Sequence, residues 1–142
     1  CAHDAWRWCT TPAAIRQQMP ATRWAGTSDS LNGPRYERLV AEFGHDVPFS
    51  VIERDPVAAS FAILDLFEGE VPLGEIFDEV RVLCQAHAML PATVMRVPYE
   101  SLEDMEEVRK LEQHLCPGRT FDERRWEMLD RLRVEVVVSK YA

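Results

Sequence analysis

The sequence has no paired cysteine motif and no long apolar run. Its four cysteines are scattered, without a Cys-x-x-Cys pair: Cys1, Cys9, Cys84 and Cys116. A structural zinc site normally shows paired ligands, so a site built from these cysteines with His87 and His114 is the weaker alternative and we expect no metal. No stretch approaches the roughly 18 to 20 apolar residues of a membrane span, and we expect no membrane association.

The chain also has no excess of positive charge. Its net charge is -8 and its pI is near 5.0, so the field of the whole molecule repels phosphate backbones and anionic lipid. The longest basic cluster, Arg124-Arg125, is interleaved with acidic residues and is typical of a solvated helix face. We therefore expect no nucleic-acid partner.

The start of the chain has no charged segment followed by an apolar one, as a secretory leader would. This predicts a cytoplasmic protein. Residue 1 is Cys and not Met, from which we expect that a segment has been removed upstream.

With 142 residues, 46% of them hydrophobic and 28% charged, the chain has the composition of one globular domain over residues 1–142. Short β-prone runs alternate with segments of helical periodicity. Strands are predicted at residues 21–25, 48–52 and 92–97, and helices at residues 34–43, 56–67, 73–89, 105–115 and from Asp122 onward. The tail, residues 134–138, is β-prone by composition or continues the last helix.

This alternation predicts an α/β fold with a three-layer parallel sheet and helices on both faces. In such a fold, ligands bind beyond the carboxyl ends of the strands. Three segments are expected at that edge: residues 26–30, 53–56 and 98–102.

At the second of these segments an arginine follows a strand just where a helix begins. The guanidinium of Arg54 and the free N–H groups of that helix would converge on one anion, with phosphate the obvious candidate. The alternative is a surface ion pair of Arg54 with Asp55 or Glu53.

The run Val51-Ile52-Glu53-Arg54-Asp55-Pro56, followed by Ala58-Ala59-Ser60 and a helix, resembles the loop with which sulfotransferases hold the ribose phosphate of phosphoadenosine phosphosulfate. The resemblance implies that Arg54 and Ser60 bind that phosphate. The later strand that ends in Tyr99-Glu100-Ser101-Leu102 is similar to the family's strand ending in Tyr-Glu-Asp-Leu. Both motifs occur in the family's order.

The resemblance also implies a fold related to that of P-loop NTPases, here incomplete at the amino-terminal side. Thr27, Ser28 and Asp29 fall where the family has its acceptor-side loop. The implied activity is transfer of a sulfuryl group to a hydroxyl or amine on a small molecule or a glycan. No residue is assigned as the catalytic base.

Two departures from the family pattern leave alternatives open. The strand and Gly-Thr loop that hold the donor's other phosphate and its sulfate are absent, so whether the chain is an enzyme stays open. The spacing from Arg54 to Ser60 is about two residues shorter than usual, which turns Ser60 by roughly 200° around a helix. Ser60 is then a helix residue that bonds to its own backbone.

The alternative function is a non-catalytic interaction protein that keeps a degenerate sulfotransferase-like fold and binds a protein partner. The acidic charge, the missing loop and the aromatic pair Trp6 and Trp8 favour it. A nucleotide phosphohydrolase or kinase is disfavoured because the chain has no Gly-x-x-x-x-Gly-Lys loop.

Overall fold

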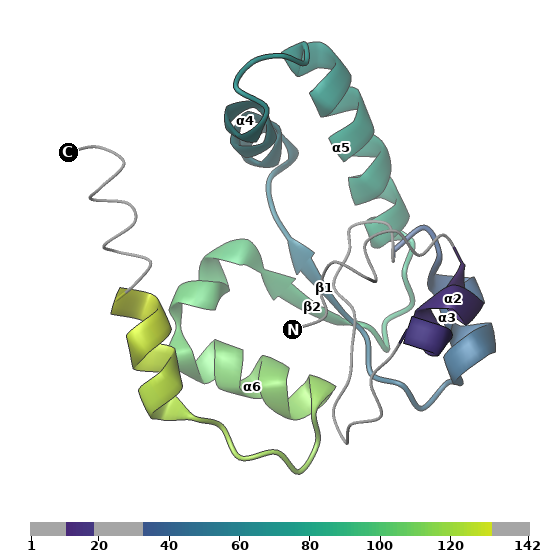
Figure 1. Cartoon of the computed structure of the whole chain (residues 1–142), viewed down its shortest axis with the longest axis vertical. Helices are drawn as coiled ribbons and strands as arrows, with labels where there is room; N and C mark the ends of the chain where they lie inside the picture. Colours follow the sequence, from purple (N-terminus) through teal and green to yellow (C-terminus); the bar gives the residue numbers. More distant parts are fainter. Residues whose placement is uncertain (1–10, 19–32, 132–142) are drawn as a thin grey trace. The chain divides into compact units, whose positions relative to one another are not determined.

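The computed structural model describes residues 11–18 and 33–131 (Figure 1). The predicted strand at residues 21–25, the loop of Thr27, Ser28 and Asp29, the pair Trp6 and Trp8, and the tail at residues 134–138 all lie outside the described residues. The chain divides into two compact units, Cys1–Tyr99 and Glu100–Ala142, and each is described by itself. The expectation of one domain over residues 1–142 stays a prediction.

The described part of the chain is mostly helical, and the strands in it form one two-stranded parallel sheet. The predicted three-layer parallel sheet is therefore wrong. β1 (Ser50–Glu53) and β2 (Met95–Pro98) have four residues each, and most of the apolar sequence around them is in helices. Two strands make two edges, so β1 is not a buried central strand, and Ile52 is 38% exposed.

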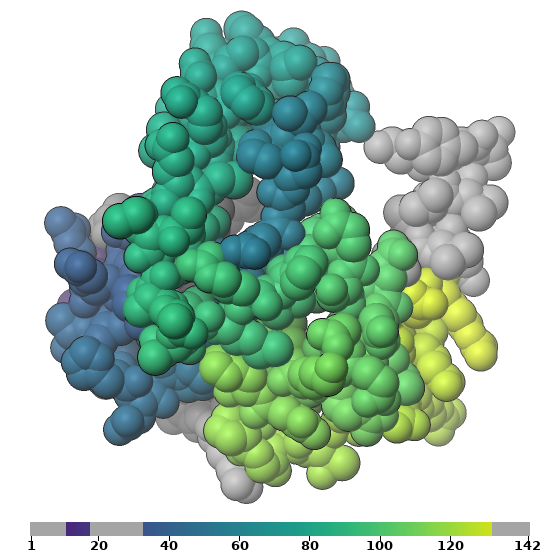
Figure 2. Space-filling view, turned by 180° about the vertical axis from the view of Figure 1, so that it is seen from behind, coloured from purple at the N-terminus to yellow at the C-terminus, as the bar shows by residue number. Residues whose placement is uncertain are grey.

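β1 and β2 run parallel, with Val51 opposite Arg96 and Glu53 opposite Pro98. Two helices connect them, α4 (Pro56–Leu66) and α5 (Leu73–Ala88). Both views of the molecule show α4 and α5 packed side by side (Figures 1 and 2). This connection places the ends of both strands at one edge of the sheet.

Local sequence signals explain the ends of α4. Pro56 occupies the first helical turn, where its missing N–H costs nothing, and Asp55 accepts a hydrogen bond from the N–H of Ala58 at 2.9 Å. At the other end the chain turns through Glu68 and Gly69, both with positive φ, of 53° and 78°. Helix α5 follows after Pro72 and agrees closely with the predicted range of 73–89.

A small apolar core joins α2 (Pro12–Gln18) and α3 (Tyr36–Phe43). Ile15 and Leu39 are each only 2% exposed and form its centre. The ring of Tyr36 meets Phe49 edge-on, with 5.0 Å between the centroids, and so ties α3 to the segment that enters β1.

The described residues of the second unit form three helices in sequence. The 3₁₀ helix η2 (Tyr99–Glu103), which begins at the last residue of the first unit, is followed by α6 (Met105–Leu115) and a helix at residues 123–131. Asp104 caps α6 through the N–H of Glu106 at 2.8 Å, and Asp122 caps the last helix through the N–H of Arg125 at 2.9 Å. The helix predicted from Asp122 onward is therefore confirmed, with Asp122 as its cap.

Candidate functional site

The carboxyl ends of β1 and β2 bring Arg54 and Tyr99 together. The two residues follow the last register pair, Glu53 and Pro98, so each is the first residue beyond its strand. The guanidinium carbon of Arg54 lies 4.2 Å from the centroid of the Tyr99 ring. A cation at this distance is attracted by the ring face, which holds the guanidinium at the sheet edge.

A second pair links the two strands just before these ends. Nη1 of Arg96 lies 2.5 Å from Oε1 of Glu53. Nη2 of Arg96 also donates to the backbone carbonyls of His87 at 3.0 Å and Leu90 at 3.1 Å. Arg96 therefore joins β2 to β1 and to the carboxyl end of α5.

The two acidic residues that flank Arg54 in sequence are both engaged elsewhere. Glu53 pairs with Arg96, and Asp55 caps α4. Within residues 11–18 and 33–131, Arg54 forms no ion pair with either of them, or with any other acidic residue. The alternative of a surface ion pair between Arg54 and a sequence neighbour is not what the structure shows.

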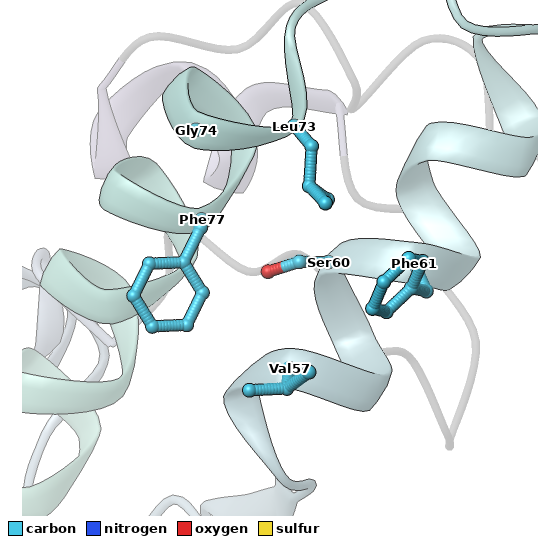
Figure 3. Close-up of a pocket in the computed structure, with 6 residues that line it drawn as sticks. All are labelled: Val57, Ser60, Phe61, Leu73, Gly74 and Phe77. Atoms are coloured by element: carbon cyan, nitrogen blue, oxygen red, sulfur yellow. The ribbon is translucent and has the colours of Figure 1, made fainter.

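Ser60 is turned toward its own helix. Its Oγ donates to the carbonyl of Pro56 at 2.6 Å, and the residue is only 1% exposed. Figure 3 shows its hydroxyl directed at the space between α4 and α5, beside a cavity of about 280 Å³. The other residues that line this cavity are apolar or glycine: Val57, Phe61, Leu73, Gly74 and Phe77. The arrangement is the alternative that the short spacing had left open for Ser60.

Two residues near this edge were not predicted from the sequence to take part in the site. Tyr99 belongs to the motif at the end of the second strand and was assigned no role at the anion site, but it is 43% exposed and lies against Arg54. Arg96 lies in the strand of the same motif, and no role was assigned to it. The register of a parallel pair would have been the signal for both, because residues that follow equivalent positions emerge side by side.

The described residues hold no cluster of three or more histidine, cysteine or acidic side chains that would bind a metal ion. Cys84 and Cys116 are free thiols. Among the helices of the described part, none is both long and apolar enough to cross a membrane.

Comparison with known proteins adds no relative. A scan against protein-family models, a search of curated proteins and a search of solved structures each found no match.

Proposed function

We propose that this chain is a sulfotransferase-like protein in which Arg54 binds the ribose phosphate of phosphoadenosine phosphosulfate. One observation carries the proposal. Arg54 stands at the carboxyl end of a parallel strand, directly before the amino terminus of α4, and is engaged there by the ring of Tyr99 and by no carboxylate of the described residues. A cation and a helix amino terminus at such an edge suit a phosphate.

The residues present fit a phosphate at Arg54 and offer less at Ser60. A guanidinium presents several N–H donors in one plane and binds two phosphate oxygens at once. The hydroxyl of Ser60 is buried and already donates to Pro56. The carboxylate of Asp55 accepts a hydrogen bond from one N–H of the first turn of α4, which leaves fewer donors there for a phosphate. The proposal therefore rests on Arg54 as the principal ligand, with Ser60 bonded to the backbone of its own helix.

The transfer step is proposed on the order of motifs in the sequence. When bound, the cofactor supplies an activated sulfuryl group for a hydroxyl or amine of a small-molecule or glycan acceptor. Thr27, Ser28 and Asp29 are proposed for the acceptor side, and no residue is assigned as the base. The cytoplasmic location expected from the sequence stays a prediction.

A non-catalytic role with a protein partner is the second candidate. The observation that favours it is the apolar surface of α4 and its end. Phe61 is 51% exposed and Leu66 is 76% exposed, and the helix is apolar on nearly all sides. A helix of that composition is normally covered.

Calorimetric titration with adenosine 3′,5′-bisphosphate, the cofactor without its sulfate, separates the two candidates. We expect micromolar affinity for the unaltered chain and at least a tenfold loss for Arg54→Ala. Arg81→Ala is the matched control, because the ion pair of Arg81 among the described residues is an exposed one with Asp78 at 3.8 Å. Absence of binding at millimolar nucleotide would contradict the proposal and favour the protein partner.

A further inference from the structure

Arg96 has a second consequence at the strand ends, beyond tying β1 to α5. Glu53 immediately precedes Arg54, and its side chain is 47% exposed. A carboxylate at this position has two ways to weaken an anion site: it repels the anion, or it turns and pairs with Arg54 itself. The ion pair with Arg96 opposes both.

The register of the two strands explains why Glu53 meets Arg96. Arg96 is in register with Val51, and successive residues of a strand point to opposite faces, so Glu53 shares a face with Arg96. Arg54, the first residue beyond the strand, contacts the ring of Tyr99 instead. The acidic and basic neighbours thus have different partners at the same strand end.

Arg96 also compensates a second negative feature. The carbonyls of His87 and Leu90 lie at the carboxyl end of α5, where the helix dipole places partial negative charge. One guanidinium therefore neutralises Glu53, the residue before Arg54, and also partners the carboxyl end of α5. In a chain of net charge -8, local compensation of this kind is needed before an anion is attracted.

We infer that Arg96 is a positioning residue for the anion site: it holds and neutralises Glu53, so that the charge of Arg54 is available to a phosphate. This inference rests on the proposed function, since the phosphate is that of adenosine 3′,5′-bisphosphate. Arg96 does not itself touch the ligand. Its guanidinium is already bonded to Glu53 and to the backbone.

Titration of adenosine 3′,5′-bisphosphate into four chains tests the inference: the unaltered protein, Arg96→Met, Glu53→Gln and the double variant. Arg96→Met leaves the charge of Glu53 uncompensated one residue away from Arg54. We therefore expect this variant to bind the nucleotide about three- to tenfold more weakly at low salt. Glu53→Gln should bind at least as tightly as the unaltered chain. The double variant should return to within about twofold of it, because the uncompensated charge is gone. High salt should shrink the differences.

The rescue separates charge compensation from a merely structural role. Both Arg96→Met and the double variant lose the bonds to α5, so a structural defect would leave both equally weak. Arg81→Met is the matched control on α5 and should bind as the unaltered chain does. Circular dichroism establishes that each variant is folded at the titration temperature, and Glu53→Gln keeps the bonds of Arg96 to α5.

Each outcome decides the matter. Rescue by Glu53→Gln supports the inference. A double variant no better than Arg96→Met, or an Arg96→Met chain as tight as the unaltered one, overturns it while the Arg54→Ala result leaves the proposed function standing. Failure of the unaltered chain to bind overturns both.

Discussion

The guanidinium of Arg54 rests over the ring of Tyr99, with 4.2 Å between its carbon and the ring centroid. The two residues are 45 positions apart in sequence, and the parallel register alone makes them neighbours. Tyr99 is 43% exposed, so the contact is at the surface and not in a core. The pair defines the edge at which we place the anion site.

Replacing Tyr99 tests whether the ring holds Arg54 in place. An exposed cation–π contact contributes about 0.5–1 kcal/mol, so Tyr99→Leu should weaken binding of adenosine 3′,5′-bisphosphate about two- to fivefold. Tyr99→Phe keeps the ring and should change the affinity by less than about twofold. Equal losses in the two variants, measured by calorimetry, would show that the hydroxyl and not the ring face matters.

Asp55→Asn separates the capping role of Asp55 from its charge. Asparagine caps a helix about as well as aspartate, so the free energy of unfolding should change by less than about 0.5 kcal/mol, whereas Asp55→Ala should cost about 1 kcal/mol. Removal of the negative charge beside Arg54 should tighten nucleotide binding about twofold or more. Asp65→Asn, on an exposed position of the same helix, is the control. Weaker binding by Asp55→Asn would argue against an anion at this helix end.

Ser60→Ala tests the phosphate contact that the sulfotransferase resemblance implies. Because Oγ donates to Pro56 and is buried, we expect the nucleotide dissociation constant to change by less than about twofold. Stability should change by less than about 1 kcal/mol, since alanine's helix propensity offsets the lost hydrogen bond. A tenfold loss of affinity without loss of stability would instead make Ser60 a ligand.

Gly33 lies against the ring of His87 on α5. A Cβ at this position would come within 2.6 Å of Nε2 and closer still to Cδ2. Gly33→Ala should therefore destabilise the chain by about 1–3 kcal/mol in urea denaturation. His87→Ala should remove most of that extra cost when the two changes are combined.

Gly74 lies on α5, the helix that carries His87, and differs from Gly33 in having free space around it. A Cβ there would meet nothing within 4 Å, so Gly74→Ala should be neutral or stabilise by up to about 1 kcal/mol. If both alanine variants behaved alike, the contact between Gly33 and His87 would not be the cause.

Arg109 connects α6 to the helix at residues 123–131. Its guanidinium pairs with Glu123 and, at 3.4 Å, with Glu106, and its carbon lies 5.0 Å from the centroid of Phe121. The hydrogen bond accepted by Glu123 raises the pKa of Arg109, so the group stays charged throughout the neutral range and its contribution there does not depend on pH.

Arg109→Met should speed hydrogen exchange of the amides in the helix at residues 123–131, because that helix loses its charged link to α6. Arg124→Met, an exposed arginine on the same helix, is the control and should leave exchange unchanged. Equal exchange rates in both variants would show that the apolar contacts alone hold the helix.

Local elements followed closely from sequence signals. Helical spacing predicts residues 56–67 for α4 and residues 105–115 for α6, and Asp122 predicts where the last helix begins. Such signals act over one or two turns, so they do not need the rest of the chain. The predicted three-layer sheet is wrong because it requires most of the short β-prone runs to have a neighbouring strand on both sides. The strands of the described residues form a single pair.

The sequence alone indicates most of the described helices and an arginine at the junction of a strand and a helix. Tertiary structure decided which side chains meet there. The register of β1 with β2 joins Arg54 to Tyr99 and Glu53 to Arg96, and the packing of α4 against α5 buries Ser60. Helix signals are read within a few residues, whereas strand pairing links positions more than 40 residues apart and depends on how the intervening helices pack.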